Sequence, residues 1–152
     1  MTKVAKAMRF FFYGTLLEGS GNAVARALQG RLRPVAPASV KGALFAIPDP
    51  HGWYPALVPD GQGTVQGTVS EALASFTDAD LARMDALEDY DPARPDLSLY
   101  VRRAVMLDGG GEAQAYVWNR PLPGDAIRIP QGDFRRWLAE TGFREFADPA
   151  GS

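Results

Sequence analysis

A single carboxylic acid, Glu88, continues the apolar side of a segment that we predict to be a helix. At about 100° per residue, Leu81, Met84 and Glu88 lie on one helix face. Glu88 also stands at the C-terminal end of this segment, where the helix dipole disfavours a carboxylate. Partial burial and the dipole would both raise the pKa of Glu88 toward the range of a general acid/base at neutral pH. The alternative is that the helix frays and Glu88 turns out to solvent.

A second candidate is the turn that follows the aromatic segment from Arg9 to Tyr13. Gly14 permits backbone dihedrals that other residues avoid, and the chain then turns toward a short predicted helix. Such a turn can direct the N–H groups of Gly14, Thr15 and Leu16 into one cavity, which suits a carboxylate or a developing oxyanion. The same residues also fit a strand end followed by an ordinary turn.

Composition excludes several other kinds of chemistry. The 152 residues include no cysteine, so disulfides and thiolate chemistry are absent, and we expect a cytoplasmic location. The one histidine, His51, lies in a Pro/Gly turn and is expected at the surface, and no Gly-x-Ser-x-Gly elbow accompanies it. These absences argue against a Ser-His-Asp triad and against a metal site built from cysteine or histidine.

Charge and hydropathy narrow the partners. The net charge is −2 with both signs scattered along the chain, which predicts no nucleic-acid partner. No stretch reaches the roughly 18 apolar residues that span a bilayer, so no membrane partner is expected. The sequence leaves the oligomeric state open.

The elements that must position these residues are short. The patterns predict strands over residues 9–13, 40–47, 53–58, 64–69, 99–107 and 114–118, and helices over 22–28, 77–88 and 134–140. Thr77 and Asp80 have the spacing of a helix-capping pair. This mixture predicts one α+β domain over 9–146 with flexible termini at 1–8 and 147–152, and with a mostly antiparallel or mixed sheet. The pattern does not decide whether the sheet closes into a barrel.

Six short motifs occur in one order that resembles the γ-glutamyl cyclotransferase-like family. The first is Tyr-Gly-Thr-Leu, which is typical of the γ-glutamylamine cyclotransferase and avirulence-induced-gene-like branch, and the fourth is similar to the segment that carries the family's catalytic glutamate. The motifs are Tyr13–Leu16, Trp53–Leu57, Val65–Val69, Met84–Tyr90, Tyr100–Arg103 and Ala115–Val117.

The resemblance implies a small mixed β-barrel flanked by short helices, and an intramolecular reaction without metal or cofactor. The α-amine of a γ-glutamyl amide attacks its own γ-carbonyl, which yields 5-oxoproline and a free amine. Glu88 is then the catalytic acid/base. The implied substrate-binding residues are Tyr13, Gly14, Thr15, Leu16, Tyr100 and Tyr116, with Arg102 or Arg103 as an alternative partner of the substrate carboxylate. An aromatic residue in a strand is more often part of the core, so these tyrosines have a structural interpretation as well.

The chain departs from the family pattern in two places near the expected site. Asp89 stands where the family usually has glycine, and the loop from Asp91 to Ser98 looks long. These departures leave the leaving amine undecided. Two alternatives stay open: a non-catalytic barrel that binds a small metabolite, and an enzyme that removes a γ-glutamyl protecting group in a biosynthetic pathway.

Overall fold

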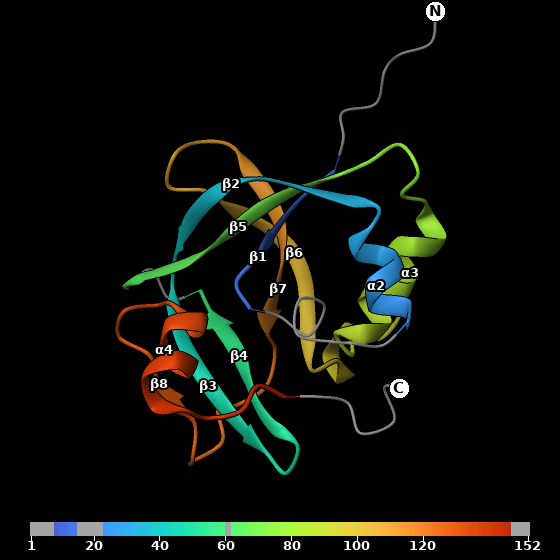
Figure 1. Ribbon diagram of the computed structural model, residues 1–152. Helices are drawn as coiled ribbons and strands as arrows, with labels where there is room; N and C mark the ends of the chain where they lie inside the picture. The colour runs from blue at the N-terminus through green and yellow to red at the C-terminus, as the bar shows by residue number, and fades with distance from the viewer. Residues whose placement is uncertain (1–7, 15–22, 60–61, 147–152) are drawn as a thin grey trace, which may run out of the picture.

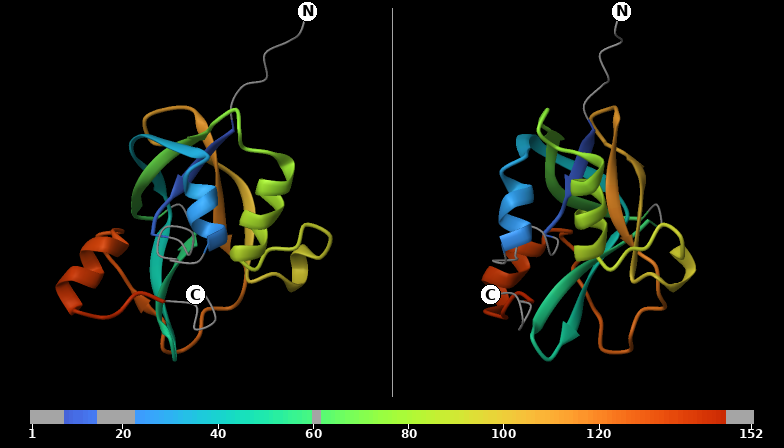
Figure 2. Two further views of the ribbon diagram at one scale, coloured as in Figure 1. Left: turned by 45° about the vertical axis from the view of Figure 1, so that its right-hand side comes forward. Right: turned by 90° about the vertical axis from the view of Figure 1, so that its right-hand side faces the viewer.

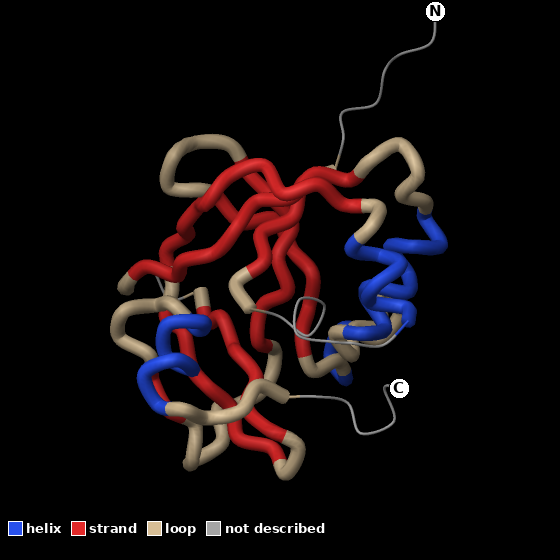
Figure 3. The backbone as a smooth tube through the Cα atoms, in the orientation of Figure 1, coloured by secondary structure: helices blue, strands red, loops and turns tan. Residues whose placement is uncertain are grey.

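A computed structural model describes residues 8–14, 23–59 and 62–146 of the chain (Figures 1 and 3). Its helices and strands are all short. The elements are β1 (Arg9–Phe12), α2 (Ala23–Gln29), β2 (Leu32–Lys41), β3 (Ala43–Asp49), β4 (Gly52–Val58), β5 (Thr64–Ala72), α3 (Asp78–Leu87), a 3₁₀ turn (Pro95–Leu97), β6 (Tyr100–Met106), β7 (Glu112–Trp118), β8 (Ile127–Arg128) and α4 (Phe134–Thr141).

The strands form two sheets. The larger sheet has the order β2-β5-β1-β7-β6, and its pairs are antiparallel except for β1 with β7. It curls until its edge strands approach each other, where one isolated bridge joins Val40 to Leu107. The smaller sheet has the order β4-β3-β8. This confirms the α+β class with a mixed sheet, whereas the described residues show a curled sheet and not the continuous ladder of a closed barrel.

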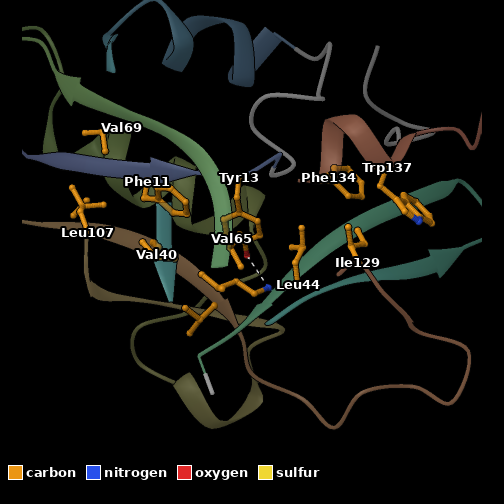
Figure 4. Packing of buried hydrophobic residues seen from close by; sticks show 14 of the residues in the cluster. Phe11, Tyr13, Val40, Leu44, Val65, Val69, Leu107, Ile129, Phe134 and Trp137 are labelled. Carbon is orange, nitrogen blue, oxygen red and sulfur yellow. Dashed lines mark hydrogen bonds between the residues drawn. The ribbon is translucent and has the colours of Figure 1, made fainter. Parts of the chain in front are cut away.

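Strand β1 runs through the middle of the larger sheet and contributes to both of its faces. Phe10 and Phe12 pack with α2 and α3, and Phe11 and Tyr13 point to the other side. Figure 2 shows α2 and α3 side by side. Figure 4 shows Phe11 and Tyr13 in the hydrophobic cluster on the face of β1 that is opposite to Phe10 and Phe12. All four aromatic residues are buried because successive side chains of a strand alternate between two covered faces.

The segment around residue 40 differs from its prediction. In place of one strand over 40–47, β2 ends at Lys41 and β3 begins at Ala43, with Gly42 between them at φ +152°. The first part of β2 escapes sequence reasoning because Pro34 and Pro37 argue against a strand. The structure accommodates both prolines in an edge strand, with a register shift directly after Pro34.

The other predicted helices and turns agree with the structure to within one or two residues. Thr77 caps α3: its hydroxyl accepts from the Asp80 amide at 3.1 Å while the Asp80 carboxylate accepts from the Thr77 amide at 2.9 Å. Gly142 ends α4 in the left-handed conformation. His51 lies exposed in the turn between β3 and β4, as expected. None of the helices in the described part of the chain is long and apolar enough to cross a membrane. The single-domain assignment over 9–146 stays a prediction.

Candidate functional site

Glu88 lies at the C-terminal end of α3 and is fully buried, with none of its surface exposed. Its amide donates to the carbonyls of Met84 and Asp85 at 3.2 and 3.1 Å, so the helical turn is complete up to this residue. Met84 is equally buried on the same helix face, and Leu81 packs partly against the same cluster. The alternative of a frayed helix end with Glu88 in solvent is therefore wrong.

The chain leaves α3 through a tight turn that sets the direction of Glu88. The Asp89 amide donates to Ala86 at 3.1 Å, and the Tyr90 amide donates to the Asp85 carbonyl at 2.9 Å. These two bonds form a Schellman motif, which requires a left-handed residue directly after the cap. Asp89 takes that conformation at φ +53°, the one positive φ of a non-glycine residue in the described ranges. The motif explains why glycine is usual at this position.

Three buried tyrosines from different parts of the larger sheet lie within the electrostatic influence of the Glu88 carboxyl. Tyr13 follows β1, Tyr100 begins β6 and Tyr116 lies in β7, and each is at most 2% exposed. Burial raises the pKa of each of the three phenols, and the negative charge of Glu88 raises all three further. The four side chains therefore lie in one electrostatic neighbourhood, although they are far apart in the sequence.

The hydroxyl protons of these tyrosines are already used within the protein. Tyr13 donates to the Tyr116 carbonyl, and Tyr100 donates to the Pro55 carbonyl at 2.5 Å. Tyr116 donates to the Asp85 carboxylate at 2.7 Å. A phenol has one proton, so each of the three oxygens can act only as an acceptor in any further hydrogen bond. Because their pKa values are raised, the tyrosines also stay protonated at neutral pH and do not serve as bases.

Strand β4 explains a second motif of the sequence. The Pro55 carbonyl holds Tyr100, and the Leu57 amide lies 3.4 Å from the Tyr13 hydroxyl oxygen, to which it donates. The smaller sheet thus fixes two of the three phenols of the larger sheet. The Tyr-Pro-Ala-Leu pattern indicates a strand in the sequence, but its role in holding tyrosines is visible only in three dimensions.

Gly14 satisfies two demands that only glycine meets together. Its φ is +105°, and a Cβ atom at this position would lie 2.7 Å from Cδ2 of Phe134 on α4. Thr15 and Leu16, predicted to contribute N–H groups, lie outside the described residues. A cavity of about 510 Å³ opens beside the turn, and Glu88 is not among its lining residues. The lining includes Tyr13, Gly14, Gln66, Thr68, Gln131 and Arg136.

Sequence reasoning missed the role of Asp85, which lies one helical turn before Glu88. Asp85 is 3% exposed, and its Oδ1 accepts from the Tyr116 hydroxyl at 2.7 Å and from Arg102 Nε at 2.9 Å. Of the two arginines left open as substrate partners, Arg102 is thus engaged by Asp85, and Arg103 is exposed. The available signal was the i, i+3 spacing of Asp85 and Glu88, which puts both acids near the inner side of the helix.

The described residues contain no group of three or more histidine, aspartate or glutamate side chains that could hold a metal ion. The groups available for chemistry near Glu88 are one buried carboxyl group and phenol oxygens that are held in place by hydrogen bonds. Such a site can exchange protons through Glu88 and can accept hydrogen bonds from a cationic amine.

Comparison with solved structures shows the same fold in proteins of low sequence identity. An uncharacterized protein from Pyrococcus horikoshii is 21% identical with a TM-score of 0.59, over 89% of this chain and 96% of that one. A protein specific to uropathogenic E. coli is 18% identical with a TM-score of 0.60, over 89% and 98%. The allophanate hydrolase of Kluyveromyces lactis is 15% identical with a TM-score of 0.62, over 90% of this chain and 22% of that one.

Comparison with curated protein sequences gives no match. A family model described as gamma-glutamyl cyclotransferase, AIG2-like, matches residues 10–136, which include Tyr13, Gly14, Glu88, Tyr100 and Tyr116. Because this match extends over far more than half of the sequence, the chain belongs to the AIG2-like gamma-glutamyl cyclotransferase family.

Proposed function

We propose that this protein is a γ-glutamyl cyclotransferase that converts a γ-glutamyl amide into 5-oxoproline and a free amine, with Glu88 as its acid/base. Membership of the family supports a cyclotransferase-type function on small γ-glutamyl substrates. The observation that carries the proposal for this chain is the fully buried Glu88 carboxyl, whose charge acts on three buried phenols with committed protons.

The phenols prepare the site for an amine. The substrate's α-ammonium carries three donors, and the oxygens of Tyr100 and Tyr116, both within the electrostatic influence of Glu88, can accept hydrogen bonds. Oxygen acceptors near a carboxylate favour a cation, whereas they disfavour a second anion at the same place. The substrate's α-amine is therefore expected to bind at Glu88, and its carboxylate to bind elsewhere.

The proton transfers follow from this placement. Glu88 takes a proton from the α-ammonium, and the exposed nitrogen lone pair attacks the γ-carbonyl carbon. The new C–N bond closes the five-membered ring, and the C–N bond to the leaving amine then breaks. The α-nitrogen loses two protons between ammonium and lactam, and the leaving group gains two and departs as an ammonium ion. Glu88 carries one proton at a time and ends as it began, which is the behaviour of a general acid/base.

The turn after β1 is proposed to bind the negative charge. Gly14 presents its backbone beside Tyr13, and Thr15 and Leu16 follow it in the sequence. N–H groups of such a turn suit either the substrate carboxylate or the oxyanion of the tetrahedral intermediate. We further propose a γ-glutamylamine as the substrate class, on the resemblance of the Tyr-Gly-Thr-Leu turn to that branch of the family.

A substrate panel tests the proposal. The purified protein is incubated with γ-glutamyl amines, γ-glutamyl amino acids and γ-glutamyl peptides, and 5-oxoproline release is measured by mass spectrometry. We expect release from at least one class, its loss in Glu88→Gln, and its retention in Glu112→Gln, a control at an exposed acid. Tight binding of a γ-glutamyl compound without any release would favour the non-catalytic barrel, and release only from a large conjugate would favour the deprotecting enzyme.

A further inference from the structure

Asp85 and Arg102 form a partly buried ion pair that the acid/base chemistry does not itself use. The Asp85 carboxylate receives three donors, namely Tyr116 Oη at 2.7 Å, Arg102 Nε at 2.9 Å and Arg102 Nη2 at 3.4 Å. Arg102 is held in turn, because its Nη1 donates to Gln114 Oε1 at 3.1 Å. The pair joins α3 to both β6 and β7.

The position of this pair on the helix matters for Glu88. Asp85 stands three residues before Glu88, and its backbone carbonyl accepts from the amides of both Glu88 and Tyr90. One residue therefore anchors the last helical turn through its side chain and closes the Schellman motif through its backbone. Asp85 is also linked to Tyr13, because Tyr116 donates its hydroxyl to Asp85 and its carbonyl accepts from the Tyr13 hydroxyl.

Without this anchor, the last turn of α3 would be less firmly held in its position. Fewer hydrogen bonds hold the backbone at the end of a helix than in its middle, and the dipole disfavours a carboxylate at this place. Asp89 adds strain because it holds a left-handed conformation without being glycine. Such an ion pair adds little net stability, but breaking it is costly because the buried Asp85 carboxylate is left without its partner. The pair therefore fixes the geometry of the helix end.

We propose that Asp85 and Arg102 are positioning residues, which hold the last turn of α3 against β6 and β7 so that the Glu88 carboxyl stays at the three phenols. This inference rests on the proposed function for its catalytic consequence. Its structural content, the anchoring of residues 88–90, is independent of any substrate.

The test compares Asp85→Asn and Arg102→Gln with a matched control at the other end of the same helix. Asp80 is likewise buried and accepts from Arg31 at 2.7 and 2.8 Å and from Arg83 at 3.1 Å. Asp80→Asn therefore removes a comparable charge from α3 without touching the Glu88 end. Arg102 is partly exposed, so Arg102→Gln keeps the test open if Asp85→Asn does not fold.

Two measurements are made on all folded variants. Amide hydrogen exchange should be faster by about tenfold or more at residues 88–90 in Asp85→Asn and Arg102→Gln, and unchanged there in Asp80→Asn. The Leu81 amide, bonded to the Thr77 carbonyl at 3.0 Å, is the internal reference. Release of 5-oxoproline should show kcat lower by about 10- to 100-fold with little change in KM, since a displacement of about 1 Å costs on that order.

The outcomes separate this inference from the proposed function. Faster exchange confined to 88–90 supports the anchor, and unchanged exchange at 88–90 overturns it, whatever the activity. Equally faster exchange throughout the chain also overturns it, because the pair would then contribute only to global stability. If the wild-type protein releases no 5-oxoproline, the proposed function fails while the exchange data still decide the anchor.

Discussion

Replacing Glu88 with glutamine is the most direct perturbation of the proposed mechanism. The two side chains have nearly the same shape. Because Glu88 is fully buried, the new amide must find its hydrogen-bond partners within the protein and not in water. The new amide N–H groups can donate to the oxygens of Tyr100 and Tyr116, whose own protons are engaged elsewhere. We therefore expect Glu88→Gln to fold and to keep the packing of α3.

The magnitudes follow from the same geometry. Glutamine can neither accept nor return a proton, so kcat should fall by at least about 100-fold, equivalent to about 2.7 kcal/mol of transition-state stabilisation. KM should change less. Removal of a carboxylate from the negative end of the α3 dipole should shift stability by no more than about 1 kcal/mol, or about 2–4 °C in Tm for a chain of this size.

The assay combines steady-state kinetics on the best substrate of the panel with a melting curve for both proteins. The exposed-acid control Glu112→Gln should match the wild type in both measurements. A Glu88→Gln variant with the wild-type melting temperature and an unchanged kcat would refute the acid/base role. A drop in Tm of 10 °C or more would refute the argument that the phenol oxygens accept the amide, and would identify Glu88 as a structural group.

Three further predictions concern stability and use thermal or chemical unfolding. Gly14→Ala should lose about 1–3 kcal/mol, because φ is +105° and the new Cβ would lie 2.7 Å from Phe134, whereas Gly109→Ala in the open hairpin turn should change little; equal losses would contradict this account. Asp89→Gly should gain about 0.5–1 kcal/mol by relieving a left-handed residue at φ +53°, and a loss of stability would show that the aspartate side chain is needed there. The hydrogen bonds from Arg31 are the largest cause that lowers the pKa of Asp80 from 3.8 to about 2. The Asp80 carboxylate therefore stabilises the folded state fully above about pH 5, and this contribution is lost as the pH falls toward 2. The difference in Tm between wild type and Asp80→Asn should therefore shrink between pH 5 and pH 2, and a constant difference over that range would disprove the assignment.

Local features of the site follow from the sequence because their causes lie within a few residues of each other. The apolar stripe of Leu81 and Met84 with Glu88, the Thr77 cap and the left-handed position at Asp89 all depend on helix periodicity and helix ends. The family resemblance likewise rests on short motifs in order, and the match over residues 10–136 confirms it.

Features that join distant parts of the chain were decided by the tertiary structure. Nothing in the local pattern indicates that Pro34 and Pro37 belong to an edge strand, because the edge exists only once the sheet is assembled. The sheet order β1-β7-β6 brings Tyr13, Tyr116 and Tyr100 together. Strand β4 of the smaller sheet then donates a hydrogen bond to the Tyr13 hydroxyl and accepts one from the Tyr100 hydroxyl.

The same reason explains why the pairing of Asp85 with Arg102 escaped the sequence analysis. A carboxylate and an arginine are ordinary surface residues until both become buried in one contact, and their pairing depends on how α3 packs on β6 and β7. From the sequence alone it follows that an acid ends an apolar helix face and that the motifs are those of a cyclotransferase family. Only the folded chain decided what surrounds that acid, since burial and partners are properties of packing between elements that are remote in sequence.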